Sequence, residues 1–518
     1  MKRKIVVSTL LMISILAVAA VANAQHPKYV FFFLGDGMAN SQIQATEAYL
    51  TTLNGGKATL AEDLLKPENR LRMCKMPVQG MQTTYDSFAL MTDSASAGTA
   101  FACGVKTVSG TIGMDNTKTV GYKSIAELAH NRGKKVGIIT SVSLDHATPA
   151  SYYASIDNRN NMNNVATQMA DSGYEFFGGG GLVSPTKANR AGDTSNDVWA
   201  LLTGNGYTVL NDRDSIMALK QSPKDKVVCI NPWLQDSSAM PYEIDRQYEN
   251  ALNPTDANKN LSLAEMTDVA IKNLYKSRGG NGFFLMVEGG KIDWACHAND
   301  AMASIGDMLD FDNAIGVALD FLKKHQGETL IVVTGDHETG GMTIGHATTA
   351  YTAYYDRLLG QKNSFTYFAQ NQWTTHKTAY SATACANWQA TNSLESDTEM
   401  VTMMSSIFGL NWSELNDYQK QKLEDAYDKS MCGSNDNGEA ENTLLYGTYE
   451  PIIVTITHIL NERASIGWTS YSHTGVPVPV FAKGAGSTEF AGFYDNTDIA
   501  KRLAKLMGIN RDLPVVKK

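Results

Sequence analysis

The sequence has few cysteines, no long basic run and, beyond the N-terminus, no apolar stretch of membrane-spanning length. None of the six cysteines forms a CxxC pair, so a cysteine-ligated zinc site is not expected, and their spacing leaves any disulfide pairing open. The net charge of −9, without a Lys/Arg run beyond residues 2–4, disfavours a general nucleic-acid surface. Because no later segment has about 18 uninterrupted apolar residues, no membrane span is predicted.

The N-terminus is typical of a secretory signal. Lys2, Arg3 and Lys4 precede an apolar stretch over residues 5–21, and Ala22-Asn23-Ala24 is a small-x-small cleavage site. This pattern predicts a signal peptide over residues 1–24 and export to the periplasm or the exterior. Such a compartment permits disulfides, and the absence of a cysteine near the cleavage site argues against a lipid anchor.

Short apolar runs alternate with helical patterns along much of the chain. Four runs, over residues 29–34, 135–140, 282–287 and 329–333, are typical of buried parallel strands. A fifth, over residues 476–481, contains two prolines and is expected at a sheet edge. Helices are predicted over residues 301–324 and 498–507, the second capped by Thr497 and stopped by Gly508. The alternation predicts an α/β fold with a doubly wound, mostly parallel sheet flanked by helices.

Two stretches fit this alternation less well. Residues 184–259 are polar and rich in turns, and residues 347–442 are rich in Tyr, Thr, Asn and Gln. The second stretch is predicted to form a crown-like lobe inserted into a catalytic core made of residues 25–346 and 443–518, with an amphipathic helix near residues 413–427. Its aromatic cluster over residues 351–373 is expected to form the core of the lobe, although a substrate rim or a dimer contact are alternatives.

Acidic and imidazole side chains follow the predicted strands. They are Asp36, Glu288, Asp293, His297, Asp336 and His337, with His146 and Thr148 beyond the strand at 135–140. Ligands of open α/β sheets bind outside the carboxyl ends of the strands, and buried acids need a partner or a metal ion. Asp and His without thiolates suit zinc, and added hydroxyl or carboxylate oxygens suit magnesium. On a helix, the i,i+4 spacing of Asp293 and His297 places both on one face.

Ser94 lies in the fragment Thr92-Asp93-Ser94-Ala-Ser96, where Asp93 is a plausible helix N-cap. At the start of a helix the dipole favours an alkoxide or a bound phosphate, and a divalent metal ion activates a serine hydroxyl as a nucleophile. Taken alone, however, the fragment favours a packing helix of small residues with a serine at its start.

Six segments together resemble the alkaline phosphatase family in their order and residues. They are Gly35-Asp36-Gly37-Met38, Asp93-Ser94-Ala-Ser-Ala with Gly104-Val-Lys-Thr107, His146-Ala-Thr148-Pro149 followed by Arg159, Val287-Glu288-Gly-Gly-x-Ile-Asp293-x-x-x-His297, Thr334-Gly-Asp336-His337 and Ser472-His473-Thr474-Gly475. The matched segments run from residue 29 to about residue 508.

The resemblance implies a role for each matched residue. Asp293, His297 and His473 would hold a first zinc ion, and Asp36, Asp336 and His337 a second. Thr148 and Glu288, with Asp36, would complete a third site of the magnesium type. Ser94 would be the nucleophile that forms phosphoserine, and Arg159 would clamp the phosphate of small phosphomonoester substrates, since a guanidinium fork matches phosphate. The family is usually homodimeric, which suggests the same here only by analogy.

Two positions depart from the best-known bacterial members, which have Asp in place of His146 and Lys in place of Trp294. His146 leaves the metal of the third site open. Trp294, near the expected phosphate, replaces a positive charge, so we expect product phosphate to be held loosely. The alternatives are a phosphodiesterase or sulfatase of the same superfamily and, from a different class, an exported metal- or phosphate-binding protein without activity.

The remaining histidines are expected on the surface or in structural roles. They are His26, His130, His325, His346, His376 and His458. Ser96 and Cys296 are expected to pack inside the protein and not to take part in the chemistry.

Overall fold

The computed structural model describes residues 26–253, 260–277, 280–385, 393–509 and 512–517. The expected signal peptide, residues 1–24, lies outside the described residues. Among those described, no helix is both long and apolar enough to cross a bilayer.

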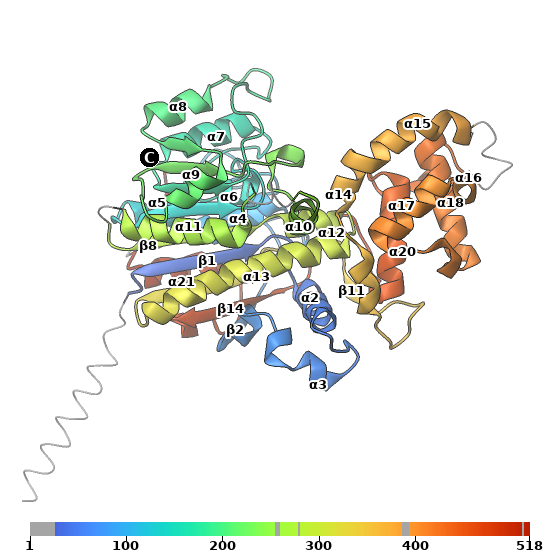
Figure 1. Ribbon diagram of the computed structural model, residues 1–518. Helices are drawn as coiled ribbons and strands as arrows, with labels where there is room; N and C mark the ends of the chain where they lie inside the picture. Colours follow the sequence, from blue (N-terminus) through green and yellow to red (C-terminus); the bar gives the residue numbers. More distant parts are fainter. Residues whose placement is uncertain (1–25, 254–259, 278–279, 386–392, 510–511, 518) are drawn as a thin grey trace, which may run out of the picture.

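A mixed, mostly parallel sheet of ten strands forms the centre of the molecule (Figure 1). In spatial order the strands are β15 (Gly492–Tyr494), β2 (Val78–Gln82), β14 (Val478–Gly484), β9 (Thr329–Gly335), β1 (Tyr29–Gly35), β8 (Phe283–Gly289), β4 (Lys135–Thr140), β5 (Phe176–Gly179), β7 (Val227–Ile230) and β6 (Thr208–Leu210). The sheet confirms the predicted α/β fold.

Helices cover both faces of this sheet, as β1 shows most clearly. Val30, Phe32 and Leu34 pack on one face with the first set of helices, and Phe31 and Phe33 pack on the other face with the second set. The first set is α4 (Ser94–Cys103), α5 (Ile125–His130), α7 (Met162–Asp171), α8 (Val198–Gly204) and α21 (Thr497–Leu506). The second set is α2 (Asn40–Leu53), α9 (Arg213–Ala218), α11 (Leu263–Lys276) and α13 (Ala301–Lys324). A strand buried on both sides reads as a continuous apolar run, which is why β1 was recognisable in the sequence.

The four apolar runs predicted as parallel strands correspond to β1, β4, β8 and β9. The edge position predicted for the fifth run is wrong, because β14 lies between β2 and β9 and is antiparallel to both. Pro479 is tolerated there because the pairing with β9 begins only at Val480. The helix at residues 301–324 has the predicted bounds, whereas α21 begins one residue early, after Asn496.

The polar stretch over residues 184–259 continues the parallel sheet, which the sequence did not indicate. It contributes β6 and β7, of only three and four residues, together with α8, α9 and α10 (Glu243–Leu252). Strands this short leave little periodicity to detect.

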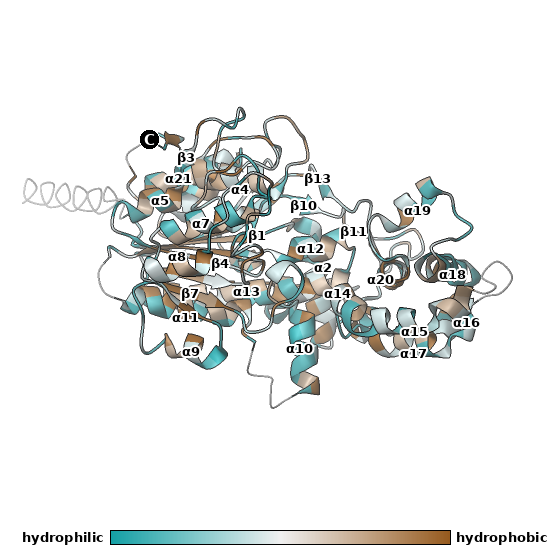
Figure 2. Ribbon diagram, turned by 90° about the horizontal axis from the view of Figure 1, so that it is seen from above, coloured by the Kyte–Doolittle hydropathy of each residue, from teal (hydrophilic) through white to brown (hydrophobic). Residues whose placement is uncertain are grey.

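A helical lobe lies beside the sheet in both views (Figures 1 and 2). Its helices are α14 (Phe365–Phe368), α15 (Thr374–Ala384), α16 (Ser393–Ser396), α17 (Thr398–Phe408), α18 (Asp417–Cys432), α19 (Glu439–Tyr446) and α20 (Pro451–Ala464). They share a hydrophobic core that extends from Phe368 to Ile459, and a disulfide joins Cys385 to Cys432. The division of the chain at residues 346 and 443 stays a prediction.

The aromatic cluster of residues 351–373 is divided among different surroundings. Phe368 and Trp373 belong to the lobe's core as expected, whereas Tyr355 packs with α2 and α13. Tyr351 is fully exposed, so the expectation is wrong for that residue. The helix expected near residues 413–427 is α18, which starts four residues later because Asn416 and Gln419 form a capping box.

Candidate active site

The ends of three adjacent strands place three carboxylates together. Strand β1 pairs in parallel with β8 and with β9, so that Gly35 lies opposite Gly289 and Gly335. Asp36 follows β1, Glu288 is near the end of β8, and Asp336 follows β9. All three side chains are buried. The register of the sheet, and not any local motif, therefore brings these acids to one point.

The turn after Asp36 requires glycine. Gly37 has φ of +75°, and a Cβ there would lie 2.9 Å from Cα of Asp293. Its N–H donates to Oδ1 of Asp336 at 3.1 Å. The absence of a side chain lets helix α12 (Lys291–His297) approach the strand ends closely.

Asp36, Asp336 and His337 form one group with ligand atoms within 4.8 Å of one another. Nε2 of His337 lies 3.4 Å from Oδ1 of Asp36 and 3.2 Å from Oδ2 of Asp336. Oδ1 of Asp36 and Oδ2 of Asp336 are buried without a hydrogen-bond partner. Burial and the neighbouring carboxylates raise the pKa of Asp36 and Asp336 well above the usual range. Such a site favours a cation among the oxygens.

A second group consists of Asp293, His337 and His473, and His297 of α12 lies directly beside it. Nε2 of His297 lies 3.3 Å from Oδ2 of Asp293 and 3.1 Å from Nε2 of His473. The ring of His473 also stacks on that of His337, with centroids 3.6 Å apart. Burial opposes ionisation, but the adjacent imidazoles hold the pKa of Asp293 well below its usual range.

Backbone carbonyls orient the imidazoles of His297 and His473. Nδ1 of His297 donates to the carbonyl of Tyr471 at 2.6 Å, and Nδ1 of His473 donates to the carbonyl of Thr92 at 2.7 Å. With Nδ1 protonated, the Nε2 lone pairs of both rings face the same space. Hydrogen bonds of this kind fix the tautomer and the orientation of histidines that bind a metal ion.

A third group consists of Asp36, His146 and Glu288. Oγ1 of Thr148 lies 3.4 Å from Oδ2 of Asp36, and Oε1 of Glu288 is buried without a partner. Burial raises the pKa of Glu288 to about 7, and burial followed by the charge of Arg159 lowers the pKa of His146 to about 3. Carboxylate and hydroxyl oxygens of this kind suit a hard cation, and the imidazole adds one nitrogen.

Ser94 is the first residue of α4 and lies beside these groups. Asp93 caps the helix by accepting a hydrogen bond from the N–H of Ser96 at 2.9 Å. Oγ of Ser94 is 3.5 Å from Nε2 of His337, and the residue is only 2% exposed. The predicted N-cap is confirmed, and the hydroxyl sits at the positive end of the helix dipole, within reach of the site.

Arg159 and Trp294 lie at the side of the site occupied by His146. Nη2 of Arg159 lies 3.1 Å from Nε2 of His146, and Nη1 donates to Oδ2 of Asp93 at 3.0 Å. The ring of Trp294, on α12, contacts that of His146 at 5.7 Å between centroids. The structure therefore brings every residue predicted for the site into one continuous cluster.

Several residues that hold this cluster in place could not be recognised from the sequence. Oγ1 of Thr339 donates to Asp293, and Oγ1 of Thr140 donates to Glu288. Glu338 accepts from Thr474, next to His473, and from Nε2 of Gln42 at 2.8 Å. The position of Glu338 directly after Asp336-His337 was the only signal, and it does not reveal a partner more than a hundred residues away.

The histidines, serine and cysteine for which no chemical role was predicted make contacts within the fold. His376 is buried and bonds Asp397 at 2.6 Å, and His458 bonds Asn299 at 2.9 Å. Oγ of Ser96 lies 2.7 Å from Oγ1 of Thr92, and Cys296 is buried as a free thiol. Within the part of the chain that the structure describes, none of these side chains belongs to a metal-type group.

Comparison with known proteins agrees with this geometry. A family model described as alkaline phosphatase matches residues 27–509. Alkaline phosphatase 3 of Bacillus subtilis is 30% identical over 94% of this chain and 90% of its own length. The repressible alkaline phosphatase of Saccharomyces cerevisiae is 27% identical, over 98% of this chain and 88% of its own.

Solved structures agree as well. The alkaline phosphatase of Thermus thermophilus superposes with a TM-score of 0.71 at 25% identity, over 95% of this chain and 93% of its own. A variant of the enzyme from the Antarctic bacterium TAB5, in which a histidine is replaced by glutamate, superposes with a TM-score of 0.58 at 28% identity, over 94% and 99% of the two chains. That structure has magnesium bound in the site named M3.

Proposed function

Since the chain belongs to the alkaline phosphatase family, and is a phosphomonoesterase by that membership, we propose that it works through a phosphoserine formed on Ser94. Two zinc ions and a third ion of the magnesium type would occupy the three groups of ligands. The observation that carries the proposal is the position of the Ser94 hydroxyl, 3.5 Å from His337, within a ring of buried acids and imidazoles.

The unpartnered oxygens of Asp36, Asp336 and Glu288 support the fit of these ions. Asp293, His297 and His473 would hold the first zinc ion, and Asp36, Asp336 and His337 the second. When bound, a pair of such ions stabilises the attacking and leaving oxygens of a phosphoryl transfer.

Asp36, Thr148, Glu288 and His146 would surround the third ion. We propose Mg²⁺ there, supported by the three oxygen ligands. The TAB5 variant that has magnesium in its M3 site carries glutamate in place of a histidine. Because His146 offers a nitrogen, which suits zinc better, elemental analysis for both metals is the decisive measurement.

The protein's own groups would bind and orient the ester. Arg159, held by Asp93 through Nη1, would donate its guanidinium fork to two phosphate oxygens, with Nη2 leaving its contact with His146. Oγ of Ser94 would lose its proton and bond to phosphorus as the bond from phosphorus to the ester oxygen breaks, and the alcohol would leave with that oxygen and one proton. Water would then attack the phosphoserine, releasing phosphate and restoring the hydroxyl. The helix dipole at Ser94 stabilises negative charge in both steps.

We also propose that the protein is exported and forms homodimers. Export is supported by the N-terminal pattern and by the disulfide between Cys385 and Cys432, which oxidising compartments permit. The homodimer rests on analogy with the family alone. Mass analysis of the mature N-terminus and light scattering of the purified protein test these two statements.

The alternatives weighed for the sequence, a diesterase or sulfatase of the same superfamily and a protein without activity, are disfavoured by membership of the family. The test is turnover of p-nitrophenyl phosphate against its diester and sulfate analogues, with metal content measured before and after chelation. We expect the monoester to be preferred and activity to fall with metal loss. Ser94→Ala should lower kcat by about three orders of magnitude with unchanged metal content, and a variant as fast as the wild type would refute the phosphoserine.

A further inference from the structure

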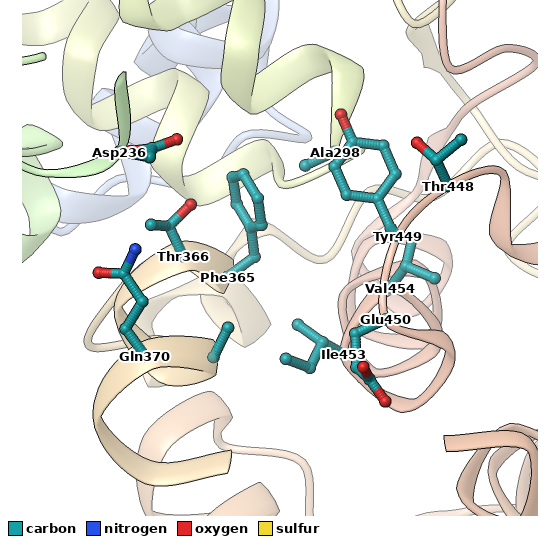
Figure 3. A pocket seen from close by; sticks show the side chains of 11 residues that line it. Asp236, Ala298, Phe365, Thr366, Gln370, Thr448, Tyr449, Glu450, Ile453 and Val454 are labelled. Carbon is teal, nitrogen blue, oxygen red and sulfur yellow. The ribbon is translucent and has the colours of Figure 1, made fainter. Parts of the chain in front are cut away.

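A cavity of about 280 Å³ lies between the core and the helical lobe (Figure 3), and none of the described residues that line it belongs to a metal-type group. The core contributes Ala298, which ends α12. The lobe contributes Phe365 from α14, Tyr449, and Ile453 from α20. The rings of Phe365 and Tyr449 meet edge to face, with centroids 5.9 Å apart. The wall is therefore largely apolar and aromatic.

Both ends of α12 connect this cavity to the candidate active site. At its C-terminal end, Ala298 directly follows His297. The ring of Tyr449 also contacts the ring of Tyr471 at 5.7 Å, and the carbonyl of Tyr471 holds His297. At its N-terminal end, Nζ of Lys291 pairs with Asp236 of the cavity wall at 3.2 Å. One residue of the cavity wall, Ala298, thus directly follows the helix that carries Asp293 and His297, and another, Asp236, pairs with the first residue of that helix.

The charges around the cavity are unfavourable for an anion. Two carboxylates line it, Asp236 and Glu450, and none of the described residues in its wall is basic. Lys291 and Lys377 lie behind these acids and pair with them, the latter at 3.2 Å from Glu450. A negative group entering this space would lose water without gaining a cationic partner, which is costly.

We propose that this cavity binds the alcohol part of the substrate and selects uncharged aromatic alcohols over anionic or very small ones. The inference rests on the proposed function, because it assigns the leaving group of that same reaction. The aromatic part would pack on Phe365, Tyr449 and Ile453 while the phosphate reaches Ser94. A volume of this size accommodates one or two fused rings but not a large ligand.

The test compares naphthyl phosphate with ethyl phosphate in the metal-loaded enzyme. The wild type should favour naphthyl phosphate in kcat/KM. Ala369→Phe places a ring in the cavity from a partly exposed position, and should reduce this preference at least about tenfold, the scale of an apolar pocket contact. Ala382→Phe is the matched control, because Ala382 is exposed on α15 and does not line the cavity.

A second variant keeps the inference testable if Ala369→Phe fails to fold. Glu450→Gln removes one carboxylate and leaves Lys377 without that partner, so kcat/KM for carboxyphenyl phosphate should rise several-fold relative to phenyl phosphate. Naphthol should also inhibit wild-type hydrolysis of ethyl phosphate competitively.

Each outcome separates the inference from the proposed function. Hydrolysis of both esters with a ratio that neither variant changes would overturn the cavity assignment and leave the monoesterase intact. If the metal-loaded wild type hydrolyses neither ester, the proposed function fails and the cavity assignment falls with it.

Discussion

Arg159 donates from Nη1 to Oδ2 of Asp93 at 3.0 Å, so the residue before the expected nucleophile fixes the residue expected to hold phosphate. The same Asp93 caps α4 and accepts from the N–H of Gly110 at 2.9 Å. Burial opposes the ionised form, but the charge of Arg159 and hydrogen bonds from Ser96 lower the pKa of Asp93. One carboxylate thus orients both the helix start and the guanidinium.

Asp93→Asn tests this double role. Asn remains a good N-cap, so the melting temperature should change little, whereas Arg159 loses a charged partner worth about 1 kcal/mol in a partly exposed pair. We expect KM for p-nitrophenyl phosphate and the inhibition constant of phosphate to rise together, roughly three- to tenfold. Tighter phosphate binding in this variant would mean that repulsion by Asp93 outweighs its orienting effect. Asp93→Ala should in addition lower the melting temperature through loss of the cap.

Trp294 is the subject of a second prediction. Its ring lies against His146, and Nζ of Lys291 is 5.1 Å from its centroid, so the side of the site near Arg159 has an aromatic wall with a buried cation behind it. Trp294→Lys should place a positive charge nearer to phosphate and lower the inhibition constant of phosphate about three- to tenfold. Trp294→Phe is the control that keeps a ring without the charge. An inhibition constant that is the same in wild type and Trp294→Lys would contradict the idea of loosely held phosphate.

Glu338 provides a third prediction, concerning metal binding. Its carboxylate accepts from Thr474 and from the N–H groups of Gly341 and Met342 at 3.0 and 2.9 Å, and its strand β10 (Glu338–Thr339) pairs with β13 (His473–Thr474). Glu338→Gln should leave Thr474, and through it His473, less well held and weaken zinc binding by up to about tenfold, the lower end of the effect of losing a group bonded directly to a metal ligand. Competition with a chromogenic chelator measures this directly. The exposed Glu439→Gln on α19 is the control, and equal zinc affinity in both variants would assign Glu338 a purely structural role.

The central strands of the sheet could be predicted from the sequence because their burial on both faces makes them continuous apolar runs. Asp36, Glu288, Asp336 and His337 could be predicted because they lie at strand ends, whereas Arg159 and His473 were identified only through the resemblance to the family. The short strands β6 and β7 lacked such a signal, and β14 was misplaced because the two prolines of the run over residues 476–481 suggested an edge. Local pattern reveals an element, but the order of strands depends on contacts between distant segments.

The contacts that orient the site residues were even harder to predict from the sequence. The carbonyls of Tyr471 and Thr92, which orient His297 and His473, belong to backbone groups that every residue possesses. The cavity beside α12 likewise depends on how the lobe packs against the core. Neither the identity nor the spacing of residues encodes such contacts in a recognisable way.

A fourth prediction concerns acid stability and uses a histidine outside the metal-type groups. Burial, followed by the charge of Lys422, lowers the pKa of His458 to about 3, against about 6.5 in an unfolded chain. Between these two values the unfolded state binds the proton and the folded state does not, so the contribution of His458 is complete above pH 6.5 and is lost progressively as the pH falls toward 3.

Urea unfolding of the metal-free protein at pH 7, 5.5 and 4.5 measures this effect. His458→Gln keeps an amide that can donate to Asn299 but cannot titrate, so the free energy of unfolding should fall less steeply with acid than in the wild type. Comparing the two proteins cancels the titration of the ligand residues that both share. Each unit of pKa difference corresponds to about 1.4 kcal/mol when a group is fully buried, and His458 is only partly buried, so the measured difference should be smaller. Parallel curves for wild type and variant would show that His458 is protonated equally in the folded and unfolded states.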